Sequence, residues 1–427
     1  MPVDEKIPYF PLFFEFSTVS TVLLLLLGIY IFFLLLDFLG NIKYILNLIV
    51  YKRKEQKRMK FSCEKSTLLD AIHTASRAVS TKSTIAILEG LKITADDKLT
   101  IAGYDLAMGI RTCLDADIVQ IGEIVLNAKI LGDIIRKLPD DIIFFETDEK
   151  LLTTIKCGRA IFNLVASTSD DFPQMPEVNC AKQIKMPQPM LKSMIAQTIF
   201  AVSDNEAKPI HTGCLFEIEQ NHLNVVAVDG YRLSVRREIL ENSFDNMKFV
   251  VPGNALREIE RILSDNSEKM VSIYPDEKHI LFEIDQTIFI TRLIDGEFLN
   301  YRAAIPQKSN SEVTVNTQEM INSIERVSLI VSEKLKNPVR MHFDGPVIKM
   351  SCITAIGKSY DECPIDSPVD NLEIGFNNKY LLDALRACDD EKIKLSLGGA
   401  LNPMVIHAID SEKFTYLVLP VRLKSGE

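Results

Sequence analysis

The sequence has 427 residues, a length typical of two to four domains, and its 47% hydrophobic and 25% charged residues are typical of a globular protein. Lys and Arg number 48 against 58 Asp and Glu, which gives a formal charge of −10 and argues against a protein that coats nucleic acid through bulk positive charge. Eight cysteines without a CxxC pair, and only six histidines, disfavour a disulfide scaffold or a structural zinc site and indicate reduced thiols. We expect no metal and no cofactor.

The first 58 residues differ from the rest of the chain. Residues 16–36 form an uncharged apolar run of 21 residues, which as a helix would span roughly 30 Å, the thickness of a bilayer core. A basic cluster follows at residues 52–58, and such a cluster just past an apolar span lies on the cytoplasmic side. We therefore predict a hydrophobic extension over residues 1–58, with a transmembrane helix at residues 16–36, and a cytoplasmic remainder whose 369 residues carry a formal charge of −12.

From Met59 onward the chain repeats itself. Three segments align with a spacing of 125 residues both times: 126–136, 251–261 and 376–386. In each copy apolar residues recur at helical spacing, and an arginine occupies the same place: Arg136, Arg261 and Arg386.

A second helical pattern precedes each of these segments by about half a repeat, and the short alternating apolar segments between the helices predict half-buried strands. Each unit is then an α+β domain in which two helices pack on one face of an antiparallel sheet. We place the three domains at residues 59–180, 181–306 and 307–427.

Such a repeat could be a stable product of gene duplication with no special function. A closed ring of these domains would, however, turn the matching cations of its helices toward one axis. Duplex DNA is a periodic polyanion, so that arrangement would attract it without reading its sequence.

Enzymatic motifs do not occur in the sequence. It has no GxxxxGK[ST], HExxH or GxSxG pattern. A polymerase site would need paired carboxylates that hold two metals, whereas Asp170 and Asp171, beside Phe172 and Pro173, are typical of a turn between strands. We expect a non-catalytic protein.

Five segments, in this order, carry a family resemblance: 59–65 (MKFSCEK), 169–176 (SDDFPQMP), 227–234 (AVDGYRLS), 295–302 (DGEFLNYR) and 419–423 (LPVRL). Together they resemble the bacterial DNA sliding clamps, the beta subunits of DNA polymerase III. The resemblance implies a head-to-tail homodimeric ring of six domains, with helices lining the hole and sheets outside. It also implies that the ring encircles duplex DNA without sequence preference and confers processivity on the replicative polymerase, and that the clamp loader and other proteins with a clamp-binding motif are further partners. The acidic charge would then lie mainly on the outer face.

The resemblance assigns DNA contacts to Lys82 and Asn205. On the helical patterns we add eight candidates for the hole: Arg77, Arg136, Lys137, Lys192, Arg257, Arg261, Arg326 and Arg386. Each could instead belong to a salt-bridged, solvated face, which has the same sequence pattern. At the dimer contact, Phe162 and Leu164 of the first domain match positions that meet Leu329 and Ile330 of the other subunit's third domain.

The resemblance also implies a pocket between the second and third domains for a short apolar peptide. Its matching residues are His211, Val228, Gly230, Tyr231, Arg232, Leu233, Leu299, Asn377, Tyr380, Leu401, Pro403, Leu417, Leu419, Pro420, Val421 and Arg422. For the Leu and Val members the alternative is ordinary core packing, whereas a buried arginine needs a polar partner. The family pattern differs at four positions that bear on pocket depth and peptide preference: His211, Leu299, Ala303 and Ala304.

Two hypotheses remain at the level of the whole chain. The first is a DNA-encircling clamp, and the second is a membrane-anchored scaffold that keeps the clamp fold but forms no functional ring. Residues 1–58 are either a genuine anchor or a leader added by an upstream start, since residues 59–61 already look like a family N-terminus. We favour the leader, because a tether would restrain sliding.

Overall fold

The structure, a computed structural model, describes residues 58–80, 83–332 and 337–423. The predicted transmembrane helix at residues 16–36, the rest of residues 1–57, and Lys82 lie outside these ranges. Within them, no helix is both long and apolar enough to cross a membrane.

The first repeat begins with a strand, continues through a helix and several strands to a second helix, and ends with three strands. Its elements are β1 (Met59–Glu64), α2 (Lys65–Ser76), β2 (Gly90–Ala95), β3 (Leu99–Tyr104), β4 (Met108–Leu114), β5 (Asp117–Gln120), β6 (Gly122–Asn127), α3 (Ala128–Lys137), β7 (Ile142–Thr147), β8 (Leu152–Cys157) and β9 (Ala160–Val165). Short 3-10 helices lie at Ala86–Glu89 and Ser169–Asp171.

The second and third repeats follow the same order with longer central strands. The second has β10 (Ile184–Pro187), α4 (Gln188–Ala196), β11 (Gly213–Val228), β12 (Arg232–Pro252), α5 (Gly253–Ile262), β13 (Met270–Pro275), β14 (His279–Ile284) and β15 (Thr287–Arg292), with 3-10 helices at Ile199–Ala201 and Pro209–Thr212. Helix α6 (Tyr301–Ala304) lies in the connector to the third repeat. The third has β16 (Ser311–Asn316), α7 (Thr317–Ser328), β17 (Val339–Thr354), β18 (Gly357–Phe376), α8 (Asn378–Arg386), β19 (Lys392–Leu397), β20 (Met404–Ala408) and β21 (Phe414–Val418).

Asparagines fix the start of three of the helices. The side-chain oxygens of Asn127, Asn316 and Asn377 accept hydrogen bonds from backbone N–H groups in the first turns of α3, α7 and α8. These groups have no partner within the helix, so a short polar side chain at this position stabilises the helix end. Helices α3 and α8 accordingly begin two residues into the aligned segments 126–136 and 376–386.

Each repeat has its own apolar core between its two helices and its strands. In the first repeat, for example, Leu68 and Ile72 of α2 and Leu131 and Ile135 of α3 are buried. Ile134, three positions after Leu131, is only partly buried, and Ile135 is the residue of that turn that enters the core. The α+β architecture predicted for each repeat, with two helices on antiparallel strands, is confirmed.

The sheets do not end at the repeat boundaries. One eight-stranded sheet, β10-β13-β14-β15-β4-β3-β2-β6, joins the first and second repeats, because β15 pairs antiparallel with β4 from Thr287 opposite Thr112 to Thr291 opposite Met108. A six-stranded sheet, β11-β12-β21-β20-β19-β16, joins the second and third repeats through β12 and β21. A separate sheet per domain would leave these edges unpaired.

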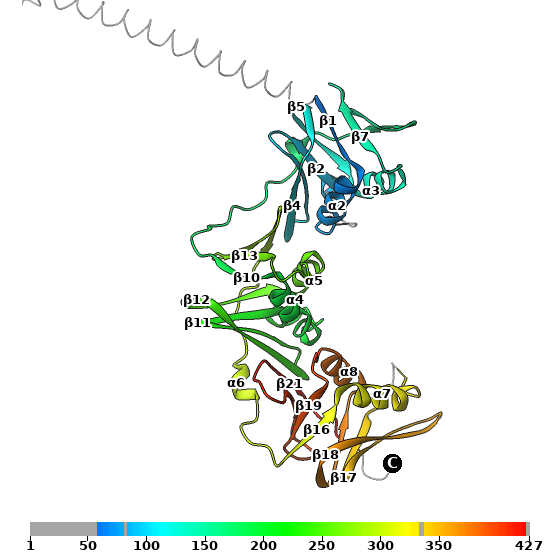
Figure 1. The fold of residues 1–427 in the computed structure, drawn as a ribbon, viewed down its shortest axis with the longest axis vertical. Coiled ribbons are helices and arrows are strands. Elements are labelled where there is room, and N and C mark those ends of the chain that lie inside the picture. The colour runs from blue at the N-terminus through cyan, green and yellow to red at the C-terminus, as the bar shows by residue number, and fades with distance from the viewer. Residues whose placement is uncertain (1–57, 81–82, 333–336, 424–427) are drawn as a thin grey trace, which may run out of the picture.

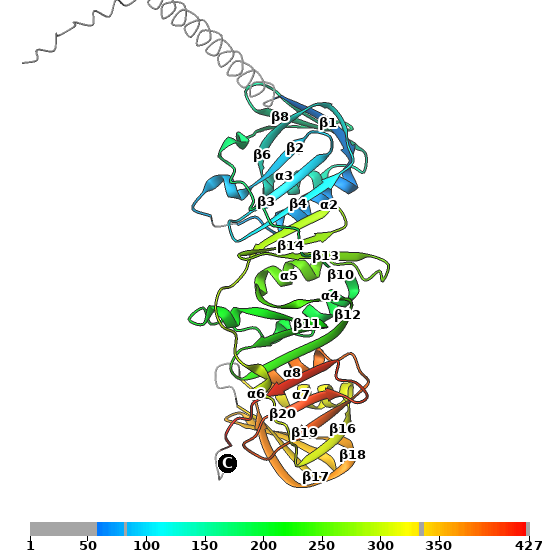
Figure 2. The ribbon, with the colours of Figure 1, turned by 90° about the vertical axis from the view of Figure 1, so that its left-hand side faces the viewer.

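The three repeats form a crescent with the helices on its concave side (Figure 1). Pairs α2 and α3, α4 and α5, and α7 and α8 follow one another along that side. Figure 2 looks onto the opposite side, where strands of all three repeats cross the molecule.

Candidate binding surfaces

The predicted cations lie on or at the ends of the concave-side helices. Arg136, Arg261 and Arg386 occupy the last turns of α3, α5 and α8, as the repeat predicted. The others lie as follows: Lys137 on α3, Lys192 on α4, Arg257 on α5, Arg326 on α7, and Arg77 at the C-terminal cap of α2. The repeat therefore brings these eight cations to one side of the crescent.

Six of these eight cations have a carboxylate partner. The ion pairs are Arg77–Glu258 (2.9 Å), Arg136–Asp133 (2.7 Å), Lys192–Asp265 (2.7 Å), Arg326–Asp361 (2.6 Å), Arg386–Glu325 (2.6 Å), and Arg261 with Glu258. Lys137 and Arg257 are exposed. The salt-bridged alternative therefore describes most of these side chains, and part of the acidic charge lies among the helices.

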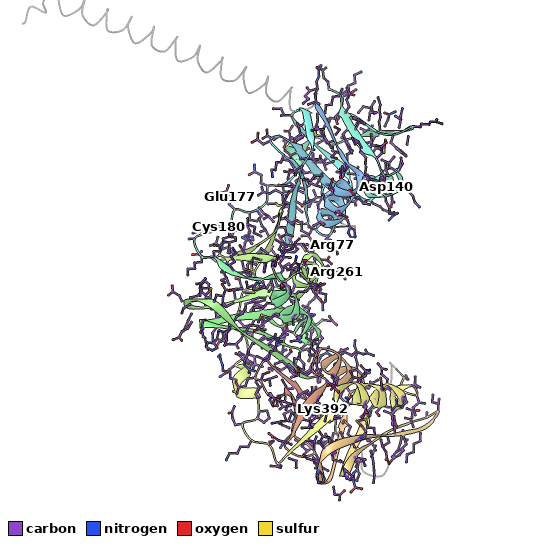
Figure 3. All side chains as sticks on the ribbon, in the orientation of Figure 1. Arg77, Asp140, Glu177, Cys180, Arg261 and Lys392 are labelled. Carbon is purple, nitrogen blue, oxygen red and sulfur yellow. The ribbon has the colours of Figure 1, made fainter. Side chains whose placement is uncertain are left out.

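Glu258 differs from the other partners because it serves two arginines from two repeats. One oxygen accepts from Arg77, at the end of α2, and the other from Arg261, one turn further along α5. Arg77 and Arg261 lie close together at the junction of the first two repeats, on the concave side (Figure 3). Sequence reasoning missed Glu258, which lies 181 positions from Arg77.

Asn205, the other polar contact implied by the resemblance, lies in the segment after the 3-10 helix Ile199–Ala201. Its side-chain oxygen accepts from the backbone of Ala207 (3.0 Å), and its own N–H donates to Ser203 (3.1 Å). These bonds shape a turn, which lines the same cavity as several predicted pocket residues.

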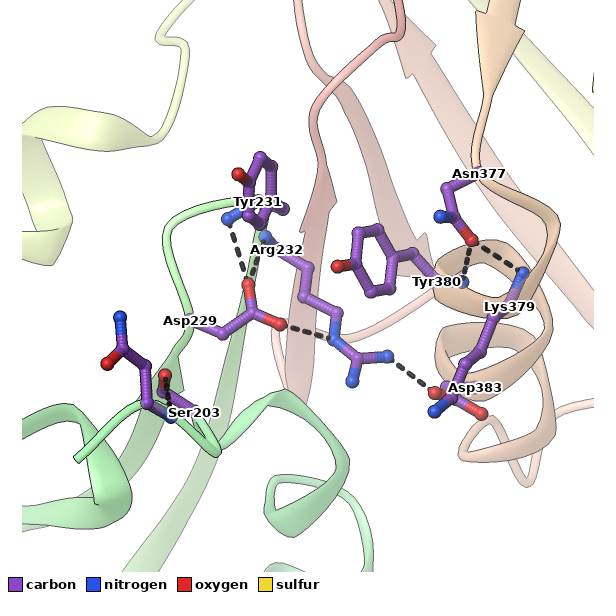
Figure 4. A network of polar contacts seen from close by, with 9 residues as sticks. Ser203, Asp229, Tyr231, Arg232, Asn377, Lys379, Tyr380 and Asp383 are labelled. Atoms are coloured by element: carbon purple, nitrogen blue, oxygen red, sulfur yellow. Dashed lines mark hydrogen bonds and ion pairs between the residues drawn. The ribbon is translucent and has the colours of Figure 1, made fainter. Parts of the chain in front are cut away.

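That cavity, of about 690 Å³, lies where the second and third repeats meet, and Arg232 is one of the residues that line it. The guanidinium of Arg232 donates to Asp229 (3.0 Å) and to Asp383 of α8 (2.5 Å), as Figure 4 shows. It also lies 4.6 Å from the ring centroid of Tyr380. The side chain is only 8% exposed, so the expectation that a buried arginine has a polar partner is confirmed.

Local backbone geometry holds this arginine in place. The other oxygen of Asp229 accepts from the backbone N–H groups of Tyr231 (2.8 Å) and Arg232 (3.0 Å). Gly230, between Asp229 and Tyr231, has a φ of +92°, a backbone conformation that residues other than glycine rarely adopt. The segment 229–232 is therefore a tight turn that presents Tyr231 outward and Arg232 inward.

Two tyrosines form the wall beside the arginine. Tyr231, 61% exposed, stacks on Tyr380 with ring centroids 5.9 Å apart. Burial, and then the charge of Asp229, raise the pKa of the Tyr380 hydroxyl, so the hydroxyl stays protonated. Asn377, predicted for the pocket, lines the cavity while its side chain caps α8.

The remaining predicted pocket residues divide into a core group and an exposed group. Val228, Leu233 and Leu417 are buried in one cluster with Tyr301, and Leu233 pairs with Leu417 across β12 and β21. Core packing, the alternative for the Leu and Val members, therefore describes these three.

The exposed group lies around the end of β21 and the turn before β20. Leu419 donates its N–H to the carbonyl of Tyr231 (2.9 Å), which brings the C-terminal segment beside the turn at residues 229–232. Leu401 and Pro403 lie in the turn between β19 and β20, next to β21. The following members of this group leave side-chain surface exposed: Leu401, Leu419, Val421 and Arg422. Pro420 and Pro403 are half-buried.

His211 and Leu299, two of the departures from the family pattern, lie toward the connector. The His211 ring meets Phe298 edge-on at 5.9 Å. Burial, and then Lys208, lower the pKa of His211. Leu299 lines a second cavity, of about 840 Å³, with Phe298 and Tyr301, and is not among the residues around Arg232.

The predicted dimer residues lie at the two ends of the crescent. Phe162 and Leu164 are on β9, the edge strand of the five-stranded sheet β5-β1-β7-β8-β9. Leu329 caps the C-terminus of α7 and is 83% exposed, and Ile330 follows it. The sheet of β7 and helix α7 are at opposite ends in Figure 1, so these residues do not meet within one chain.

No group of three or more His, Cys, Asp or Glu in the described ranges is arranged to hold a metal ion. All eight cysteines are free thiols.

Comparison with known proteins agrees over all three repeats. Models of the N-terminal, central and C-terminal domains of the DNA polymerase III beta subunit match residues 59–176, 185–300 and 302–422. The beta sliding clamps of Bacillus subtilis and Halalkalibacterium halodurans are 36% and 33% identical, over 85% of this chain and 100% of each relative.

Solved structures of sliding clamps also match this chain. The DNA polymerase sliding clamp of Bacillus subtilis superposes with a TM-score of 0.83 at 34% identity, over 86% of this chain and 100% of that one. A putative DNA polymerase III beta subunit from Eubacterium rectale has a TM-score of 0.82 at 37% identity, with the same coverage. The chain therefore belongs to the family of beta sliding clamps, the beta subunits of DNA polymerase III.

Proposed function

We propose that two copies of this chain close head to tail into a ring that encircles duplex DNA and keeps the replicative polymerase on its template. The observation that carries the proposal is the crescent itself: the helices that carry the cations lie on its concave side, and apolar side chains are exposed at both ends. The ring contributes topology and needs no catalytic group. Its place of action is the replisome in the cytoplasm.

The ends of the crescent support a head-to-tail contact. Strand β9 is an unpaired sheet edge, and Phe162 on it is 37% exposed. At the other end, Leu329 and Tyr360 are exposed, and Ser359 donates to the carbonyl of Val327, so β18 and the end of α7 lie together there. An unpaired edge with apolar neighbours is a template for pairing with another chain.

Binding to DNA in this ring is electrostatic and independent of sequence. The concave-side cations, with Asn205 and Lys82, would meet phosphates rather than base edges. Because most of those cations already have carboxylate partners, the surface attracts DNA weakly, which suits a ring that must slide.

Partner proteins would bind around Arg232. The tyrosines Tyr231 and Tyr380 provide apolar contact area, and the nearby turn and the segment after β21 provide backbone polar groups. We assign this surface to the polymerase, the clamp loader and other proteins that carry a clamp-binding peptide.

The function can be tested by comparing how well the protein stays on circular and on linear DNA. The full chain, loaded onto nicked circular DNA by a clamp loader, should stay bound through gel filtration and be lost when a restriction enzyme linearises the circle. Equal retention on both forms would contradict encirclement. A monomer at micromolar concentration would instead favour the membrane-anchored scaffold, the second hypothesis from the sequence.

A further inference from the structure

We propose that Glu258 competes with DNA phosphates for Arg77 and Arg261, so that this one carboxylate sets how loosely the concave surface holds DNA. The inference rests on the proposed function, because it assumes that duplex DNA passes along these helices. The new element is an acidic residue that lowers the affinity of the ring for DNA.

The geometry makes Glu258 a shared partner. Arg77 donates to one oxygen at 2.9 Å, and Arg261 donates to the other. The three side chains join the end of α2 to α5, and Figure 3 shows the two arginines side by side on the concave side.

Burial makes this pair different from the other ion pairs on these helices. The side chains of Glu258 and Arg77 are 18% and 20% exposed, whereas those of Arg136 and Asp133 are 63% and 52% exposed. Water and salt screen an exposed pair strongly and a half-buried pair much less. Glu258 therefore keeps Arg77 neutralised at salt concentrations that weaken the exposed Arg136–Asp133 pair.

The consequence for DNA follows from counterion release. A free guanidinium that neutralises a phosphate steepens the salt dependence of binding by about 0.9 in log K against log salt. A guanidinium already neutralised by a carboxylate contributes less, and the carboxylate also repels the phosphate. Arg261, 58% exposed, is the arginine that a phosphate would reach first.

A purely structural role for Glu258, as a tether between the first two repeats, makes a different prediction. Those repeats are already joined by the β15–β4 ladder and by a buried hydrogen bond of 3.0 Å between Thr287 and Thr112. Loss of a tether would lower the melting temperature and weaken retention. Loss of a competitor would strengthen DNA binding.

The experiment measures binding of the full-length chain to a fluorescent duplex by anisotropy at several NaCl concentrations. Glu258→Gln keeps the length of the side chain and removes its charge. We expect the magnitude of the salt slope to rise by about one to two, and affinity near 0.1 M salt to rise on the order of 10-fold. Asp344→Asn, which removes the same charge from the surface pair of Asp344 and Lys349 on β17, should leave both values unchanged.

A second variant tests whether the released arginines cause the steeper salt dependence. Arg77→Gln combined with Glu258→Gln removes one of the released cations and should lower the slope again by about one. A slope equal to wild type in Glu258→Gln, in a protein that still stays on nicked circles, would overturn this inference and leave the proposed function standing. If the wild-type protein itself does not stay on nicked circular DNA, the proposed function is overturned.

Discussion

The hydroxyl of Tyr301 donates a 2.5 Å hydrogen bond to the carboxylate of Glu217, and both side chains are buried. Glu217 is on β11, and Tyr301 begins α6 in the connector to the third repeat. Lys248 and Arg302 pair with the same carboxylate, at 2.6 and 2.7 Å. A buried charge of this kind is tolerated only when it is fully partnered, so the network fixes the connector to the outer part of the second repeat.

Removing the tyrosine hydroxyl should destabilise the protein. Tyr301→Phe leaves the buried carboxylate with one partner fewer, and a hydrogen bond to a charged group contributes about 1.5–3 kcal/mol. Urea unfolding should show a loss of this size. Tyr274→Phe is the matched control, because Tyr274 donates to Glu283 at 2.9 Å on the surface, and it should change stability by less than about 0.5 kcal/mol. Equal losses in the two variants would contradict the importance of burial here.

Acid should weaken the same network. Burial opposes ionisation of Glu217, but hydrogen bonds from Lys248, Tyr301 and Arg302 outweigh it and hold the pKa below its usual value. A carboxyl with a lower pKa in the folded state contributes stability above the unfolded pKa of about 4.3, and this contribution is lost as the pH falls through the folded pKa. Glu217→Gln cannot titrate, so the free-energy gap between wild type and variant should be largest near neutral pH and shrink below about pH 4. A gap that does not change with pH would refute this assignment.

Truncating an exposed tyrosine should weaken partner binding without unfolding the protein. Tyr231 is 61% exposed and stacks on Tyr380 beside Arg232. We expect Tyr231→Ala to lower the affinity for a clamp-binding peptide by on the order of 10-fold, as measured by calorimetry, with the melting temperature unchanged. Ile239→Ala, on β12 and 64% exposed, is the control and should bind like wild type. Unchanged affinity in Tyr231→Ala would remove this residue from the pocket.

A charge at the α7 end of the crescent should separate the two subunits of the proposed ring. Leu329→Asp places a carboxylate in the proposed subunit contact, and burying an unpaired charge is costly. Light scattering at micromolar concentration should show a dimer for wild type and a monomer for the variant. Val119→Asp, on β5 at the opposite edge of the sheet from β9, should remain dimeric. Dimers of Leu329→Asp would exclude this end as the contact.

Much of the fold could be predicted because it depends on local patterns. Short segments of the sequence contain the helical period and the arginines at matching positions. They also contain the Asn residues that cap α3, α7 and α8. Asp229, the near partner of Arg232, lies three positions away, inside a segment that carried the family resemblance. Local chemistry of this kind is visible in one sequence.

What could not be predicted depends on pairs far apart in the chain. Asp383 is 151 positions from Arg232, and Glu258 is 181 from Arg77, so nothing in either local sequence identifies the partner. The same holds for the ladder between β15 and β4, since many edge strands have the alternation needed to pair. The sequence left each predicted cation as either a free charge or part of a salt bridge, and six of the eight have a carboxylate partner in the structure.

The sheets that cross the repeat boundaries have a mechanical consequence for the proposed ring. To swing one domain away from the next, the backbone ladder between β15 and β4, or between β12 and β21, would have to break along several residues at once. The two ladders should therefore make each subunit resist bending at its repeat junctions. In the proposed ring of two such subunits, opening would therefore separate one subunit from the other at a contact between them and would leave the ladders inside each subunit intact.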